Sequence, residues 1–161
     1  WTVSLWENVE AGFSTRNLYL HFLIHTEVSD MADRKPIIPL GKTPNPAFPP
    51  GVQVGEFLFV SGHASTDASG NLVGLRDCEI QTRQVMSNIR TVLEAAGGSM
   101  ADVIKITCFL TDVADYAAYG KVRIETFPND PPASSTVIVA GLVRPEFLVE
   151  VEAVAHLPGR G

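Results

Sequence analysis

The strongest constraint on the fold is a helical period near the middle of the chain, followed at once by a strand pattern. Apolar residues recur at the spacing of one helix face at Val85, Ile89, Val92, Leu93 and Ala96. Asp77 can cap the start of this helix, and Gly97 with Gly98 ends it. Residues 103–110 then read as a strand. The helix pattern followed by the strand pattern predicts a helix that packs against a sheet.

The two faces of the predicted strand 103–110 can be read from its alternation. We expect one face to carry Ile104, Ile106, Cys108 and Leu110. We expect the other face to carry Val103, Lys105, Thr107 and Phe109. The first set is the more apolar and is the candidate core face.

Further elements follow from local patterns. Residues 36–50 hold six prolines and predict an extended lead-in that Gly55 closes. Residues 57–62, 135–140 and 147–155 predict strands, and a short strand is expected around residues 72–74. A second helix is expected to start at Asp112 or Asp115 and to run to about Phe127, where Pro128 stops it.

The order strand, helix, strand, helix, strand, strand predicts an α+β fold with both helices on one side of the sheet. The strands carry more apolar residues than one helix layer can cover: Phe59, Val137, Val139, Val149 and Val151. Partner subunits could cover the remainder.

Charge and cysteine content exclude several classes of function. The net charge of −6 and the pI near 5.1 argue against nucleic acid as a partner, because phosphate binding needs a basic surface. Cys78 and Cys108 make no disulfide framework, and no clustered His and Cys set predicts a metal site. Cys108 lies in an apolar run, whereas Cys78 precedes a helix, where a thiolate is favoured.

The first thirty residues differ from the rest. Met31 looks like an ordinary start, so we expect residues 1–30 to be an appendage, either added during cloning or an upstream extension, and residues 31–161 to be a single domain. The apolar stretch 18–24 is too short to span a bilayer and lacks the flanks of a signal peptide. We expect a cytoplasmic protein without a membrane partner.

Several motifs together resemble the Rid family (reactive intermediate deaminase, YjgF-like, formerly endoribonuclease L-PSP or translation initiation inhibitor). They are Phe57-Leu-Phe-Val-Ser-Gly-His63, Gln81-Thr82, Asn88, Ala95-Ala-Gly97, Asp102-Val-Ile-Lys-Ile-Thr-Cys-Phe-Leu110, Pro132-Ala-Ser-Ser135 and Leu148-Val-Glu-Val-Glu-Ala-Val-Ala155. The resemblance runs from about Ala47 to Leu157. It implies a mixed sheet, a homotrimer whose sheets form a central barrel, and small-molecule clefts between subunits. It implies no cofactor and no metal.

The resemblance also implies a reaction, the hydrolysis of an enamine or imine to a keto acid and ammonia. Glu150 matches the family's glutamate, which positions water, and Ser61 and Gly62 match its cleft wall. Ser134 stands where an arginine grips the substrate carboxylate in the best-understood members, and His63 stands where glutamine is common. The match of Phe48 to a tyrosine of some members depends on a proline-rich alignment.

Each candidate has an alternative interpretation from the residues alone. Glu150 and Glu152 lie roughly 7 Å apart on one strand face. They are either solvated acids or, in a cleft, an acid/base catalyst with a raised pKa. His63 is either a hydrogen-bonded turn histidine or a proton carrier. Ser134 is better interpreted as a small cleft-wall residue than as a nucleophile, because no GxSxG elbow surrounds it.

Because Ser134 replaces the family's arginine, the resemblance does not determine which substrate the protein acts on. Serine supplies no charged fork, so a replacement cation would have to come from Lys105 or, preferably, Arg144. The sequence therefore supports a divergent Rid-type hydrolase of another imine or enamine. The alternative is a Rid-fold trimer that binds a ligand or has a structural role without catalysis, and an RNase is disfavoured by charge.

Overall fold

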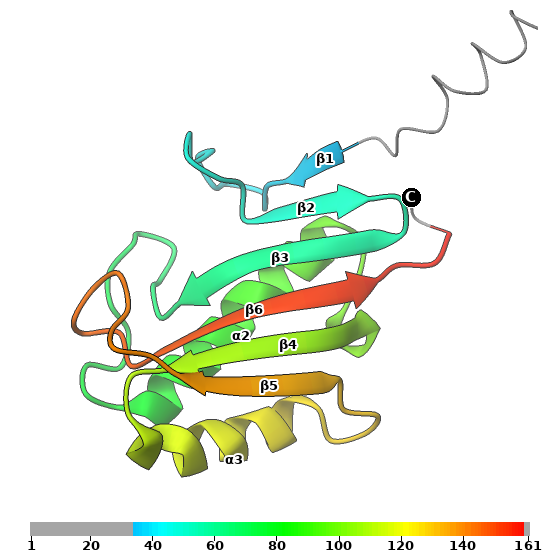
Figure 1. The fold of residues 1–161 in the computed structure, drawn as a ribbon. Coiled ribbons are helices and arrows are strands. Elements are labelled where there is room, and N and C mark those ends of the chain that lie inside the picture. Colours follow the sequence, from blue (N-terminus) through cyan, green and yellow to red (C-terminus); the bar gives the residue numbers. More distant parts are fainter. Residues whose placement is uncertain (1–33, 160–161) are drawn as a thin grey trace, which may run out of the picture. The chain divides into compact units, whose positions relative to one another are not determined.

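The computed structural model describes residues 34–159, which form a sheet of six strands with two helices packed on one face (Figure 1). The elements are β1 (Arg34–Ile37), β2 (Gly51–Val54), β3 (Phe57–Ala64), α2 (Cys78–Ala95), β4 (Val103–Leu110), α3 (Tyr116–Thr126), β5 (Ala133–Ile138) and β6 (Val149–His156). Single turns of 3-10 helix, Met100–Asp102 and Val113–Asp115, precede β4 and α3. The appendage predicted at residues 1–30 lies outside the described residues.

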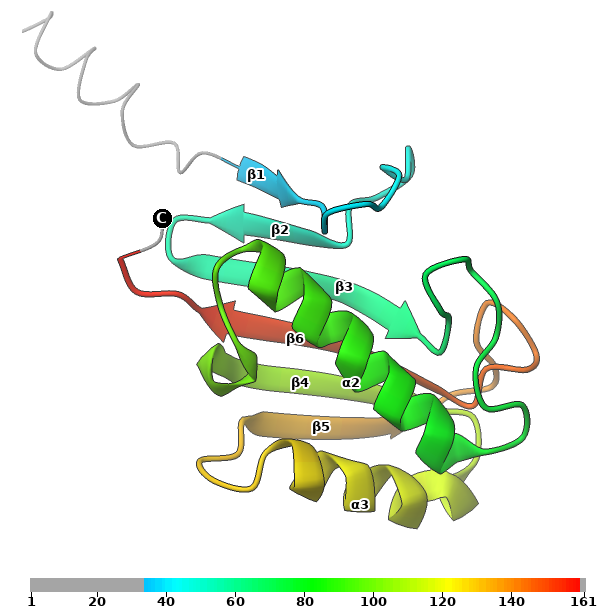
Figure 2. The ribbon, with the colours of Figure 1, turned by 180° about the vertical axis from the view of Figure 1, so that it is seen from behind.

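The strand order across the sheet is β1-β2-β3-β6-β4-β5. Strands β4 and β5 pair in parallel, whereas all other neighbours are antiparallel. Figure 2 shows α2 crossing one face of this sheet, with α3 along the β5 edge. The α+β class, the mixed sheet and the two helices are therefore confirmed.

Helix α2 forms where its apolar period predicts. The Asp77 side chain accepts a hydrogen bond from the Ile80 amide at 2.9 Å and so caps the first turn. The helix ends because Gly97 adopts a φ of 78°, which favours glycine. The Gly98 amide then donates to the Leu93 carbonyl at 2.8 Å.

Strand β4 has the predicted bounds, but a bulge changes its first residues. The register against β6 shifts between Val103 and Lys105. As a result Val103 is buried and Ile104 is exposed, so the prediction that placed Ile104 on the core face was wrong. Beyond the bulge the alternation holds, and Ile106, Cys108 and Leu110 enter the core.

Two strands that the sequence does not indicate border the proline-rich lead-in, β1 at its start and β2 after its last proline. Strand β2 pairs with β3, and β1 pairs with β2 at the sheet edge. Pro36 is tolerated in β1 because an edge strand has one side without ladder partners. The short strand predicted around residues 72–74 is reduced to one bridge between Thr66 and Leu72.

The core lies between the sheet and the two helices. The Asp112 side chain accepts from the Ala114 amide at 2.8 Å and caps the 3-10 turn that leads into α3. Helix α3 itself contributes buried Tyr119 and Val122. From the sheet, Val149 and Val151 are fully buried in the same core. Their prediction as surplus apolar residues was wrong, because they lie on the helix-covered face.

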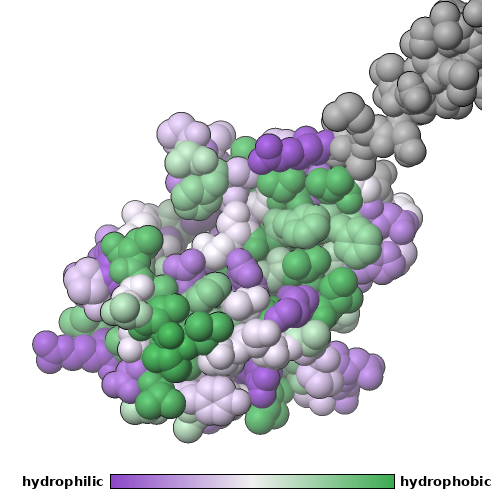
Figure 3. All heavy atoms as spheres, in the orientation of Figure 1, coloured by the Kyte–Doolittle hydropathy of each residue, from purple (hydrophilic) through white to green (hydrophobic). Residues whose placement is uncertain are grey.

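The opposite, open face of the sheet still carries exposed apolar side chains. Phe59 is 50% exposed and Val137 is 45% exposed, as predicted for apolar side chains that the helices do not cover. Phe57 is a third exposed apolar side chain, at 45%. Val139 follows β5 and is half-buried. Figure 3 shows apolar side chains gathered in two areas of this face with a more polar band between them.

Candidate functional site

The candidate site begins where β3 and β6 lie side by side, at Gly62 and Glu150. A Cβ built on Gly62 would overlap Oε1 of Glu150 and lie 3.0 Å from its Cδ. The Glu150 carboxylate therefore rests directly on the Gly62 backbone, an approach that only glycine leaves free. The structure thus brings together two of the residues predicted for the site.

The environment of Glu150 raises the pKa of its carboxyl group. Partial burial is the larger cause, since it penalises the charged form. The second cause is Glu152, which follows two residues later on the same face of β6. A carboxylate with a raised pKa is a better proton acceptor than an ordinary surface glutamate.

Ser61 connects this site to the proline-rich segment. Its hydroxyl donates to the Pro49 carbonyl at 2.8 Å, and its amide donates to the Pro50 carbonyl at 2.9 Å. Both bonds fix the segment that carries Phe48, whose side chain is 54% exposed. Ser61 thus holds the site's rim in place, and Phe48 extends from that rim into solvent.

His63 is placed apart from Glu150. It pairs with Val151 across the sheet, and Val151 is in the core, so His63 and Glu150 lie on opposite faces. Burial lowers the pKa of His63, and Lys42 lowers it further, while a hydrogen bond to the Pro50 carbonyl opposes them. Among residues 34–159 the buried Nε2 has no hydrogen-bond partner.

Ser134 is also on the face opposite to Glu150. It aligns with buried Ile106 in the parallel β4–β5 pair and lies beside the hydroxyl of Tyr119 under α3. Strands β6 and β4 separate its strand from β3. Within one protomer, the structure therefore does not bring Ser134 to the Glu150 carboxylate.

The two predicted replacement cations have different surroundings. Arg144 lies in the loop before β6, with its Nε 3.7 Å from Glu146 and its guanidinium 4.9 Å from the Phe147 ring centroid. Lys105 donates from Nζ to Ser135 Oγ at 2.9 Å and to the Ile106 carbonyl at 2.8 Å. Both cations are therefore already engaged by neighbouring groups.

A shallow depression of about 300 Å³ lies on the open face next to the site. Its polar lining comes from Ser61, Lys105, Thr107 and Glu152. Sequence analysis left Thr107 out of the site, although its position on the same strand face as Lys105 was visible in the alternation of β4. The depression can hold a small polar molecule beside a cation and a carboxylate.

Burial makes both cysteines weak nucleophiles. It raises the pKa of Cys78 to about 11 and the pKa of Cys108 to about 12. Within the described part of the chain, no group of three His, Cys, Asp or Glu side chains is arranged to hold a metal. The helices of that part are also too short or too polar to cross a bilayer.

Comparison with known proteins gives a consistent match. The family model of endoribonuclease L-PSP matches residues 42–157. A protein from Entamoeba histolytica that carries the endoribonuclease L-PSP name is 33% identical, with a TM-score of 0.72 over 78% of this chain and 100% of its own. A Rid-family protein of unknown function from Yersinia pestis is 29% identical, with a TM-score of 0.73 over 78% and 100%. A YjgF/YER057c/UK114 member from Mycobacterium tuberculosis is 26% identical, with a TM-score of 0.66 over the same shares.

Proposed function

Because the chain belongs to the endoribonuclease L-PSP family, which includes the YjgF and Rid proteins, we propose that it hydrolyses a small imine or enamine metabolite. The observation that carries the proposal is the Glu150 carboxylate, seated on Gly62 with a raised pKa. The substrate differs from that of the arginine-bearing members, since Ser134 supplies no charged fork.

In the proposed reaction Glu150 acts as general base and then as general acid. Water adds to the carbon of the protonated imine while one of its protons passes to the Glu150 carboxylate, which gives a neutral carbinolamine. Glu150 then returns this proton to nitrogen, the C–N bond breaks, and the hydroxyl proton passes to the departing ammonia as the C=O bond of the product forms. An enamine substrate first tautomerises to the imine. Ser61 and Gly62 form the wall against which the substrate is placed.

The proposed assembly is a homotrimer with the ligand cleft at the subunit boundary and a central barrel formed by the sheets. The exposed Phe57, Phe59 and Val137 on the open face support it, because a partner sheet would cover them. Sedimentation should give about three chain masses. A stable monomer would contradict the assembly, and with it the interfacial cleft. We place the protein in the cytoplasm, in keeping with its two free cysteines.

A second candidate is a trimer that binds a small ligand without catalysis. It is favoured by Ser134 and His63, which lie away from Glu150 within one protomer. RNA cleavage is the weakest candidate, because the chain is acidic and the open face presents Glu150 and Glu152.

The two candidates separate in a turnover assay. Imines generated in situ by an amino-acid oxidase from a panel of amino acids would be offered to the full chain, and keto-acid release would be followed. Hydrolysis should accelerate for at least one imine and return to the background rate in Glu150→Gln. Binding without acceleration for every imine would establish the non-catalytic candidate instead.

The missing arginine gives a second test. Against 2-aminoacrylate, made from serine by a pyridoxal-phosphate dehydratase, the wild-type protein should show negligible hydrolysis. Ser134→Arg should restore some activity, since Ser61, Gly62 and Glu150 remain in matching places. Robust wild-type activity would refute the argument and would direct attention to Arg144 as the clamp.

A further inference from the structure

Glu152 stands in the middle of the open face without a cation beside it. Its cross-strand partner on β4 is Thr107, so the two side chains lie on the same face. The Glu152 side chain lines the depression of about 300 Å³, together with Thr107 and Ser61. Among residues 34–159, no basic side chain forms an ion pair with it. The depression therefore presents a carboxylate without a counter-charge.

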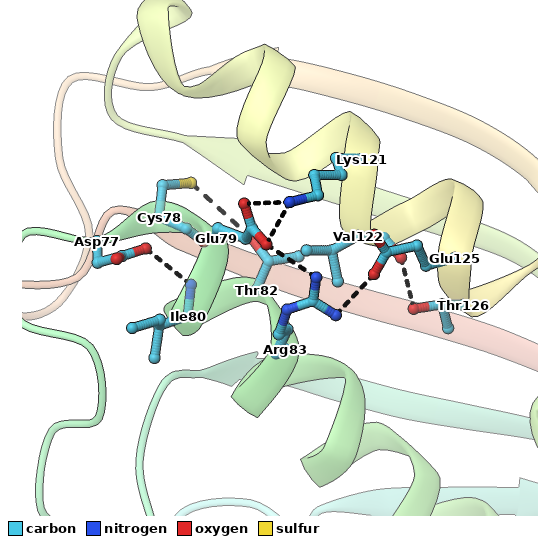
Figure 4. A network of polar contacts seen from close by, with 10 residues as sticks. All are labelled: Asp77, Cys78, Glu79, Ile80, Thr82, Arg83, Lys121, Val122, Glu125 and Thr126. Carbon is cyan, nitrogen blue, oxygen red and sulfur yellow. Dashed lines mark hydrogen bonds and ion pairs between the residues drawn. The ribbon is translucent and has the colours of Figure 1, made fainter.

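The acids between the two helices are in a different situation. Figure 4 shows Glu79 bound by Lys121 and by Arg83, both at 2.8 Å. Glu125 is bound by Arg83 at 2.7 Å. These ion pairs join α2 to α3 and occupy both carboxylates. Glu152 differs from them in having no basic partner, and from a solvated acid in lining a depression next to the candidate site.

The cation that lines the depression is directed elsewhere. Of the described residues around the depression, only Lys105 is basic. It aligns with Val154, two residues further along β6 than Glu152. Its Nζ donates to the Ile106 carbonyl at 2.8 Å and to Ser135 Oγ at 2.9 Å. The Glu152 carboxylate is therefore left for a cationic group that enters the depression.

The spacing of Glu152 and Glu150 indicates the length of a matching ligand. The two residues are about 7 Å apart on one strand face, which is close to the length of an extended arginine side chain. The charge of Glu152 reaches Glu150, because it is the second cause of the raised pKa of Glu150. A cation bound at Glu152 would relieve this repulsion while the imine carbon lies at Glu150.

We propose that Glu152 selects the substrate by binding a cationic side chain, so that the imine hydrolysed at Glu150 is one formed from a basic amino acid such as arginine. The inference rests on the proposed hydrolysis and adds the charge of the substrate to it. An anionic side chain would be repelled by Glu152, and a neutral one would leave it unpaired. In the proposed trimer a partner sheet would remove water from Glu152, which increases the advantage of a cationic ligand.

Binding is tested on the full chain with free arginine and free citrulline, which have nearly the same shape but differ by one positive charge. Arginine should give saturable NMR shifts at the Thr107 amide. Citrulline should bind at least about tenfold more weakly, a loss between those of exposed and buried charge pairs. Glu152→Gln should bind arginine as weakly as citrulline. Glu94→Gln, which removes an exposed carboxylate of α2, should bind arginine as wild type does.

Turnover gives a second readout, on the imines that an amino-acid oxidase makes from arginine and from citrulline. In the wild-type protein kcat/KM should be at least about tenfold higher for the arginine imine, mainly through KM. In Glu152→Gln the ratio of the two kcat/KM values should fall to about one. Glu152 also affects the pKa of Glu150, but that effect acts on both imines alike and cancels from the ratio.

The inference is overturned if arginine and citrulline bind equally well, if Glu152→Gln binds arginine like wild type, or if Glu94→Gln weakens binding as much as Glu152→Gln. Arginine binding through Glu152 without hydrolysis of any imine would refute the proposed hydrolysis but keep Glu152 as the residue that selects a cationic ligand. Hydrolysis of both imines with equal kcat/KM would support the hydrolysis and refute the role of Glu152.

Discussion

Replacing Gly62 with alanine should displace the Glu150 carboxylate while leaving the fold intact. The new Cβ would overlap Oε1 of Glu150 and lie 3.0 Å from Cδ and 3.3 Å from Cγ. Carbon atoms in contact normally stand about 3.5–4.0 Å apart. The carboxylate must therefore retreat or change rotamer, and the space over Gly62 is filled by a methyl group.

The net effect on stability should be small. Gly62 is not among the residues of positive φ, so alanine can adopt its backbone conformation. The stiffer unfolded chain contributes about 0.4–1 kcal/mol of stability. Forcing Glu150 off its rotamer costs about 0.5–1.5 kcal/mol. The two contributions nearly cancel, and the thermal midpoint should move by no more than about 4 °C.

The effect on the carboxylate should be larger than the effect on stability. In the wild-type protein, burial raises the pKa of Glu150 first and Glu152 raises it second. Moving the carboxylate outward restores its hydration, so its pKa should fall toward that of an ordinary glutamate. Imine hydrolysis should drop by at least about tenfold, because a displacement of about 1 Å can cost 100-fold in rate.

A carboxyl-carbon NMR titration of Gly62→Ala and wild type measures the pKa directly. Gly141→Ala is the matched control, since a Cβ there meets nothing within 4 Å, and its Glu150 should titrate like wild type. An unchanged Glu150 pKa in Gly62→Ala would refute the placement of the carboxylate on the glycine. Loss of the thermal transition would refute the energetic reasoning.

Other predictions concern groups away from Glu150. Burial lowers the pKa of His63 in the folded protein. As the pH falls below about 6.5, His63 is therefore protonated in the unfolded chain before it is protonated in the folded chain, and the free energy of unfolding declines. The thermal midpoint of His63→Gln should fall less than that of wild type between about pH 7.5 and about pH 5.5, and equal pH dependence would contradict the burial argument. Gly120→Ala should raise the midpoint by about 2–4 °C, since its Cβ meets nothing within 4 Å and alanine favours helix; an unchanged or lowered midpoint counts against it. Cys78 and Cys108 should resist alkylation at about pH 8 until the protein unfolds, and rapid labelling of the native protein would show accessible thiolates.

The elements with local signals could be predicted from the sequence. The period of α2, its cap at Asp77 and its stop at Gly97 are all encoded within a few residues, and the structure confirms them. Strand β4 was found for the same reason. Strands β1 and β2 were not recognised, because their pairing is set by β3 and the prolines around them argue against strands.

The candidate site was predictable as a set of residues but not as a geometry. The contact between Glu150 and Gly62 follows from two motifs that are far apart in the sequence and meet only through the β3–β6 register. A register shift between Val60 and His63 determines which face each following side chain takes, and no local pattern reports it. Tyr119 and Arg123 were interpreted only as part of a helix stripe, since the contact of the Arg123 guanidinium with the Tyr119 ring is visible only in three dimensions.

The position of β6 at the centre of the sheet affects how the protein is made. The last strand of the described region fits between β3 and β4, so during synthesis the earlier strands have no complete sheet to join until residue 156 has been added. Before then, β3 and β4 present unpaired edges, which are prone to join the edges of other chains. A nascent chain that stalls before β6 would therefore be a substrate for chaperones or proteases and would have no site at Glu150.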